Sequence, residues 1–136
     1  GVELLASYDF DRGRIVFGYT SLSKDEDYGV ANVDASFYAL NFARHRATLA
    51  FIYELAPGVE LRSDNVFRIQ RDNLLRTEGT SEDAVLSSLG LYYFPESVEG
   101  LEIGLAVVNL WDSDFEEIPS VPAAPRQISL NATYRW

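Results

Sequence analysis

The stretch LEIGLAVVNLWDSDF-EEIPSVPAAP-RQISLNATYRW, residues 101–136, decides the fold of this chain. It predicts a strand, a loop and a second strand. In the second strand, apolar residues alternate with polar ones: Ile128, Leu130, Ala132, Tyr134 and Trp136 share one face, and Gln127, Ser129, Asn131, Thr133 and Arg135 share the other. Side chains alternate between faces along a strand. A strand with one apolar face is expected in an antiparallel sheet, both in a soluble sandwich and in a membrane barrel.

The rest of the chain repeats this alternation. We predict seven strands, at residues 2–10, 14–23, 46–55, 59–70, 83–94, 101–112 and 126–136. Their lengths are close to the ~9–11 residues that a tilted strand needs to cross a bilayer, and exceed the ~5–6 that are usual in globular proteins. Strand length therefore favours a membrane barrel.

The connections between the predicted strands alternate in length. Short turns follow the first, third and fifth strands, at residues 11–13, 56–58 and 95–100, and long polar loops follow the others, at residues 24–43, 71–82 and 113–125. In an up-and-down meander, all short turns then lie at one end of the sheet, as in outer-membrane barrels. We therefore expect an all-β fold, an antiparallel up-and-down transmembrane β-barrel of which these strands form one part. The long loops are the candidates for the extracellular side.

The two faces of the strands differ in chemistry. The residues that we expect to face the lumen are Glu60, Arg62, Asp64, Arg68 and Asn131. Charges on one face of a strand cannot lie against an apolar core unless they pair, whereas a wet or plugged lumen accommodates them. The opposite face carries aromatic residues near the short-turn ends: Tyr8, Phe10, Tyr53, Tyr93, Tyr134 and Trp136. We expect them to face lipid as an interfacial girdle, the alternative being aromatic packing inside a soluble β-sandwich.

Composition excludes several classes of protein. The net charge of −10 argues against a nucleic-acid partner, which needs a basic surface. The absence of Cys excludes a disulfide framework and a thiolate metal site. No run of 18 apolar residues occurs, so no transmembrane helix is expected. The chain also lacks Met, so Gly1 is not expected to be a native start, and the sequence could be a mature form or a piece of a longer one.

We expect no catalysis, no cofactor and no metal site. The single histidine, His45, stands at a predicted loop-to-strand junction, where a solvated or interfacial role is favoured over a catalytic base. Acidic residues gather in two predicted loops, Asp25, Glu26 and Asp27 in the first and Asp112, Asp114, Glu116 and Glu117 around the third. Such clusters could bind calcium through oxygen ligands, but the first lacks the ligand spacing and central glycine of an EF-hand loop. Solvated extracellular loops are the favoured interpretation of both.

An ordered set of segments supports a resemblance to a known family. These are LAVVNLWD at residues 105–112, FEE at 115–117, PRQISL at 125–130 and the terminal YRW at 134–136. In this order, they resemble the C-terminal portion of a TonB-dependent outer-membrane receptor. Members of that family usually end in Phe, and this chain ends in Trp136. Family barrels have about 22 strands around a plug, so residues 1–136 would be the C-terminal segment of the barrel domain, with no plug domain in this chain.

The resemblance implies a function and a set of partners. It implies TonB-dependent uptake of a scarce nutrient, such as a ferric siderophore, a cobalamin or a glycan, across the outer membrane of a Gram-negative bacterium. The implied partners are outer-membrane lipid, the remaining strands and plug, and TonB, which would be contacted through parts outside this chain. Tyr134 and Trp136 resemble the terminal signal that the barrel-assembly machinery reads, and they could equally anchor the interface. The alternatives are a passive porin-like or structural barrel and, less favoured, a soluble β-sandwich binding module.

Overall fold

The computed structural model describes residues 1–23, 43–70, 83–118 and 121–136. These residues form one seven-stranded sheet in the order β1-β2-β3-β4-β5-β6-β9 and a separate pair, β7-β8. The strands are β1 (Val2–Phe10), β2 (Gly13–Ser21), β3 (Ala43–Ala56), β4 (Val59–Gln70), β5 (Asp83–Tyr93), β6 (Leu101–Val108), β7 (Glu116–Ile118), β8 (Val121–Pro122) and β9 (Gln127–Tyr134). Every neighbouring pair is antiparallel, so the predicted all-β antiparallel meander is confirmed. Within these residues, no helix is long and apolar enough to cross a membrane.

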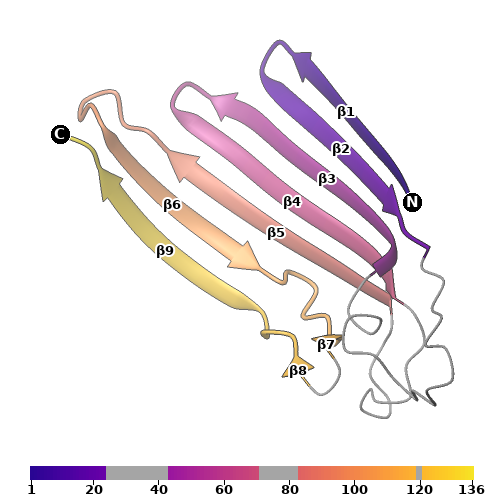
Figure 1. The fold of residues 1–136 in the computed structure, drawn as a ribbon. Coiled ribbons are helices and arrows are strands. Elements are labelled where there is room, and N and C mark those ends of the chain that lie inside the picture. The colour runs from indigo at the N-terminus through magenta and orange to yellow at the C-terminus, as the bar shows by residue number, and fades with distance from the viewer. Residues whose placement is uncertain (24–42, 71–82, 119–120) are drawn as a thin grey trace, which may run out of the picture.

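The sheet has two distinct ends (Figure 1). The hairpins β1-β2, β3-β4 and β5-β6 turn at one end, which also carries the C-terminus and which we call the turn end. The strands β2, β4 and β6 finish at the opposite end, which we call the loop end. Only Asp11 and Arg12 separate β1 from β2, and only Pro57 and Gly58 separate β3 from β4. Gly58 has a φ of 71°, a conformation that glycine adopts without steric cost.

Continuous register gives the sheet two faces of different chemistry. Paired residues of neighbouring strands carry their side chains on the same face. The apolar face is defined by Leu4, Tyr8, Phe17, Leu49, Phe67, Leu89, Leu91, Ile103, Leu105, Ile128, Leu130 and Tyr134, among others. The mixed face carries charged and small residues, including Arg46, Glu60, Arg62, Arg68, Gly90, Gly104 and Asn131, together with the apolar Leu5, Ile52, Val66 and Leu86.

The described part of the chain has almost no hydrophobic core. Ala84 and Phe115 are its only buried apolar residues, whereas Ile128 and Leu130 are 71% and 77% exposed. The sheet is a single open layer, with β1 and β9 as its two edge strands (Figure 1). The membrane barrel therefore stays a proposal, since a closed sheet is not part of this structure.

Several predicted boundaries are wrong. β6 ends at Val108, not at residue 112, because Asn109 adopts a φ of 51° and turns the chain out of the ladder. β3 begins at Ala43, so His45 lies inside a strand and not at a loop junction. The outer limits of the second, fifth and last predicted strands also differ, since β2 runs from Gly13 to Ser21, β5 ends at Tyr93 and β9 ends at Tyr134. The third predicted loop contains the short strands β7 and β8.

Two of the predicted loops cannot be compared with the structure. Residues 24–42, 71–82 and 119–120 lie outside the described residues, and with them the predicted extracellular residues Asp25, Glu26 and Asp27.

Candidate functional site

The mixed face carries an arginine held by an acid and two aromatic rings. The Arg62 guanidinium donates from Nε to the Glu60 carboxylate. Its Cζ atom lies 4.0 Å from the ring centroid of Tyr92 and 5.8 Å from that of Phe94. The two β4 residues are two positions apart, which puts both on one face of the strand. Glu60 is the Cα partner of Glu54, so the ion pair with Arg62 compensates one of two opposed carboxylates.

Two glycines make room for the aromatic ring in this cluster. A Cβ atom on Gly90 would lie 2.6 Å from Tyr92 Cε2, and one on Gly104 would lie 2.9 Å from Tyr92 Cε1. The Tyr92 ring therefore occupies the space above both glycines, one on its own strand and one on β6. Asn131 of β9 is the Cα partner of Gly104, and its Oδ1 also occupies the space above that glycine. β4, β5, β6 and β9 are thus joined by side chains across the mixed face.

A pair of arginines lies on the same face at the loop end. Arg46 of β3 and Arg68 of β4 are Cα partners, so two positive side chains stand directly opposite each other. The Cζ atom of Arg68 lies 5.8 Å from the ring centroid of Phe115, which is buried. Gln70, two positions beyond Arg68, is 4% exposed, and neither its Nε2 nor its Oε1 has a hydrogen-bond partner among the residues that the structure describes.

The residues predicted to face a lumen do share one face of the sheet, but they do not form one cluster. Glu60, Arg62 and Asn131 lie in the turn-end half, Arg68 lies at the loop end, and Asp64 is exposed between them. The sequence patterns did not point to Gly90, Tyr92, Gly104, Arg46 or Gln70. The pattern Gly-x-Tyr at residues 90–92 was a usable signal, because a glycine two positions from an aromatic residue shares its face. The opposition of Arg46 to Arg68 depends on register, which the sequence did not reveal.

The residues that carried the family resemblance form a hydrogen-bonded junction after β6. Asn109 is buried, and its Nδ2 donates to the carbonyl oxygens of Ser113, at 3.1 Å, and of Ala124, at 3.0 Å. Its Oδ1 accepts from the backbone N–H of Ser113 at 2.9 Å. Asp112 accepts from the backbone N–H of Arg126 at 2.8 Å. The junction therefore ties the end of β6 to the segment that leads into β9.

The tryptophan of the same segment lies over β5. Trp111 donates from Nε1 to Ser87 Oγ at 2.8 Å, and Ser87 shares the apolar face with Leu89. The indole is 64% exposed. It thus presents an apolar ring with a satisfied N–H at the loop end, as aromatic residues do at membrane interfaces.

The third-loop acids do not gather into one site. Asp112 binds backbone at the junction, Asp114 is exposed, and Glu116 is buried in β7. Glu117 also lies within β7. Across residues 1–23, 43–70, 83–118 and 121–136, no three His, Cys, Asp or Glu side chains are grouped so that they could hold a metal ion. His45 Nδ1 and the Tyr19 hydroxyl are hydrogen-bonded at 2.9 Å, and the imidazole and phenol rings of the two residues are stacked.

A row of aromatic rings lies on the apolar face at the turn end. Phe10 lies 6.2 Å from Tyr8, 6.4 Å from Phe51 and 6.1 Å from Tyr53, measured between ring centroids, with the rings stacked. The register of β1, β2 and β3 creates this row, because Gly13 stands between Phe10 and Tyr53 and carries no side chain to separate them. Trp136 follows β9 and is fully exposed.

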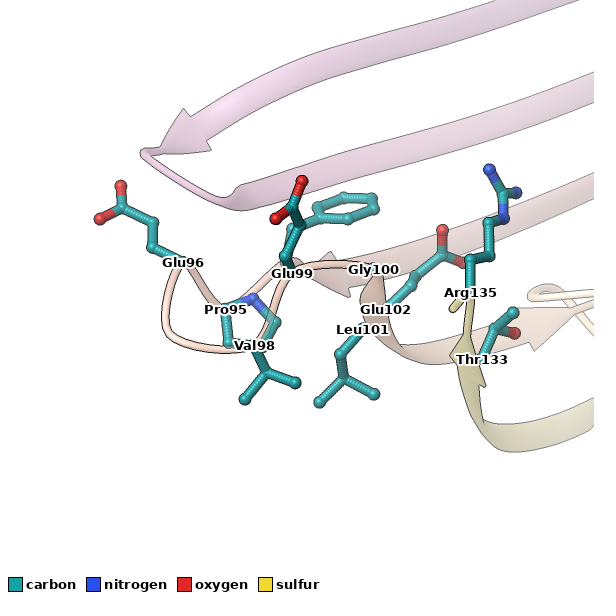
Figure 2. Close-up of a pocket in the computed structure, with 10 residues that line it drawn as sticks. Pro95, Glu96, Val98, Glu99, Gly100, Leu101, Glu102, Thr133 and Arg135 are labelled. Carbon is teal, nitrogen blue, oxygen red and sulfur yellow. The ribbon is translucent and has the colours of Figure 1, made fainter.

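A hollow of about 400 Å³ opens at the turn end between the β5-β6 connection and the end of β9 (Figure 2). Glu96 and Glu99 extend on the same side as Arg135, and Val98 and Leu101 extend on the other. Gly100, with a φ of 82°, accepts from the Arg135 N–H at 3.0 Å. The hollow is shallow and acidic, and none of its contacts implies a reaction.

Comparisons with known proteins add no family. Scans of family models, of curated proteins and of solved structures each found no match to this chain.

Proposed function

We propose that residues 1–136 form part of the wall of a transmembrane β-barrel in the outer membrane of a Gram-negative bacterium. This barrel would belong to a TonB-dependent receptor that imports a scarce nutrient such as a ferric siderophore, a cobalamin or a glycan. The observation that carries the proposal is the uncovered apolar face of a single-layer antiparallel sheet.

Energetics support a lipid environment for this face. Fully burying one large apolar side chain is worth about 1.5–3 kcal/mol. Ten such side chains left in water would forgo about 15–30 kcal/mol, which exceeds the ~5–15 kcal/mol stability of a typical domain. Tyr8, Leu49, Leu91, Leu105 and Leu130 are all exposed, and they come from five different strands. The face therefore needs a cover, and the stacked aromatic row at the turn end fits a membrane interface.

The chemistry of the mixed face supports the proposal that it lines a barrel interior that is wet or filled by polar contacts. Arg62 is satisfied by Glu60 and by the Tyr92 ring, so the charge is compensated on the sheet itself. Paired charges and small residues suit the inside of a barrel, where water or a plug replaces an apolar core.

The edges support a larger barrel. β1 and β9 each pair on one side only within the described sheet. Unpaired backbone N–H and C=O groups are not tolerated in hydrocarbon, so additional strands would have to complete the wall. The plug and the segment that contacts TonB would belong to other parts of the receptor. The resemblance of the junction around Asn109 and Asp112 to the family's late strands is what favours a receptor over a passive barrel.

Single-cysteine labelling of the intact polypeptide that carries this sequence would test the membrane assignment. Residues 1–136 contain no Cys, so Leu130→Cys and Asn131→Cys differ only in the face that they report. In isolated outer membranes, a water-soluble maleimide should label position 131 through the lumen and leave position 130 unlabelled. Equal labelling of both positions, or recovery of the protein in the soluble fraction, would contradict a membrane barrel.

Uptake measurements would separate the receptor from a passive barrel. Cells with and without a functional TonB system should be compared for accumulation of radiolabelled ferric siderophores, cobalamin and glycans. A receptor requires TonB for at least one of them. Diffusion of small solutes that does not depend on TonB would indicate a porin-like barrel.

A further inference from the structure

Three polar residues interrupt the apolar face near the middle of β4 and β5. Asn65 and Ser87 are Cα partners, and Ser63 lies two positions before Asn65, so all three share this face. We call Ser63, Asn65 and Ser87 the polar patch. The residues around it on the same face are all uncharged and apolar: Leu49, Phe51, Leu61, Phe67, Val85 and Leu89.

The polar patch keeps one acceptor and one donor unused. Asn65 donates from Nδ2 to the carbonyl oxygen of Leu49 at 3.1 Å and to Ser63 Oγ at 3.0 Å. Both amide hydrogens are thereby engaged, whereas Asn65 Oδ1 accepts no hydrogen bond from any residue in the described ranges. The Ser63 hydroxyl accepts in this contact and still has its own hydrogen to donate. A free acceptor and a free donor therefore lie side by side.

Lipid offers these two groups no hydrogen bond. This inference rests on the proposed function, in which the apolar face lies against hydrocarbon. Phe67 and Ile69 separate Asn65 from the loop end of β4, and Leu61 and Val59 lie toward the turn end. An unpaired polar group in hydrocarbon is costly, and polar side chains of membrane-spanning segments form hydrogen bonds to neighbouring segments. The polar patch therefore indicates a contact with a second protein surface in the membrane.

An aromatic residue borders the polar patch. The Trp111 side chain is 64% exposed, and its Nε1 donates to Ser87 Oγ at 2.8 Å. This hydrogen bond holds the indole over β5, next to the strand that carries Asn65. Tryptophan is enriched among the residues that contribute most to protein interfaces, and a side chain held in place before binding loses less entropy. Trp111 is thus a suitable apolar anchor for the contact.

We propose that the polar patch and Trp111 form the contact between two copies of this chain that lie side by side in the membrane. A two-fold axis brings the same patch of both copies together. The free Ser63 hydroxyl of one copy then donates to the free Asn65 Oδ1 of the other, and symmetry provides the reverse hydrogen bond. An uncharged contact also suits two chains of net charge −10, which repel each other through their charged surfaces.

Sedimentation equilibrium of the intact, detergent-solubilised polypeptide would test the contact. The protein should dimerise reversibly, and Asn65→Leu should raise the dissociation constant about tenfold or more, because each dimer loses two hydrogen bonds. Ser63→Ala should have a similar effect, since it removes the donors of the same two bonds. Thr48→Val is the matched control, because it removes a hydroxyl group from the mixed face of the neighbouring strand β3.

Thiol cross-linking would locate the contact in isolated outer membranes. In a background otherwise free of Cys, Phe67→Cys treated with a membrane-permeable bismaleimide should give a covalent homodimer, because position 67 is exposed and adjoins the polar patch. Leu130→Cys is the control, since it lies on the same face but on the edge strand β9. It should remain monomeric.

The outcomes separate the contact from the proposed function. A membrane protein that stays monomeric at all concentrations, with no homodimer from Phe67→Cys, would overturn the contact and leave the barrel unaffected. Dimers that neither Asn65→Leu nor Ser63→Ala weakens, or that Thr48→Val weakens equally, would overturn the role of the polar patch.

Two further results would be decisive. Cross-linking of position 67 to a different protein, without a homodimer, would overturn a second copy as the partner. A protein that proves soluble in the labelling experiment, yet forms a dimer that Asn65→Leu weakens, would keep the contact and reject the membrane receptor. If one of the two patch variants does not fold, the other variant and the cross-linking comparison decide.

Discussion

The Tyr92 ring on β5 occupies the space that a side chain at Gly104 on β6 would need, since a Cβ there would lie 2.9 Å from Tyr92 Cε1. The two residues are Cα partners. The ring also supports Arg62, whose Cζ lies 4.0 Å from its centroid. A glycine on one strand thus positions an aromatic ring on the next, and the ring positions a charged group on a third.

Substitution of Gly104 tests this arrangement. Gly104→Ala should destabilise the protein by about 1–3 kcal/mol, because the added methyl group meets the Tyr92 ring and Asn131 Oδ1. Urea unfolding in detergent micelles would measure the loss. In a Tyr92→Ala background the same change should cost less, because one of its two obstacles is gone. Ser129→Ala, at an exposed position of β9, is the control and should leave the midpoint unchanged.

The Asn109 junction yields a second prediction. Asn109→Ala should lower the free energy of unfolding by about 2–4 kcal/mol, because it removes three side-chain hydrogen bonds. Alanine would also have to hold the φ of 51° without the hydrogen bonds that stabilise this conformation in Asn109. Asn109→Gly should cost less, since glycine tolerates that φ and only the hydrogen bonds are lost. Thermal unfolding monitored by circular dichroism would rank the two variants. Equal stability of parent and Asn109→Ala would show that the junction does not stabilise the end of β6.

The ion pair on β4 can be tested with two matched charge removals. Glu60→Gln should destabilise the protein by about 0.5–1 kcal/mol at low salt, because it removes the negative charge that pairs with Arg62. The effect should be small because both side chains are partly exposed. The cost should shrink at high salt as the interaction is screened. Asp64→Asn removes the same charge from the same face of the same strand, at an exposed position. Equal effects of the two substitutions on the unfolding midpoint would argue against a specific pair.

A substitution at Trp136 would separate an effect on stability from an effect on barrel assembly. Trp136 is fully exposed, so Trp136→Ala should leave the urea midpoint of the purified, refolded protein unchanged. If Trp136 is read during barrel assembly, the same substitution should lower the amount recovered in outer membranes several-fold, and Trp136→Phe should restore it. Quantitative immunoblots of membrane fractions would measure the yield. Normal recovery of Trp136→Ala would assign the residue no role in assembly.

The predictable part of the fold rests on local patterns. Apolar and polar residues alternate through residues 127–134, and that period-two pattern is sufficient to predict a strand with two unlike faces. The turn around Pro57 and Gly58 was equally visible, because glycine at a tight turn meets a local backbone requirement. The end of β6 was missed because LWD continues the apolar run, while its termination depends on hydrogen bonds from Asn109 to Ala124, fifteen residues away in sequence.

Local sequence patterns are sufficient to predict the seven strands of the main sheet, the alternation of short and long connections and the separation of an apolar face from a charged one, because each of these depends on neighbouring residues. Which residues meet across strands depends on the folded sheet: Arg46 lies opposite Arg68, Tyr92 lies over Gly104, and Asp112 is bound to Arg126. These contacts follow from the register of the strands. A hairpin turn and two bulges in the β3-β4 ladder set which residue stands opposite which, and a shift of one residue would move every side chain to the other face.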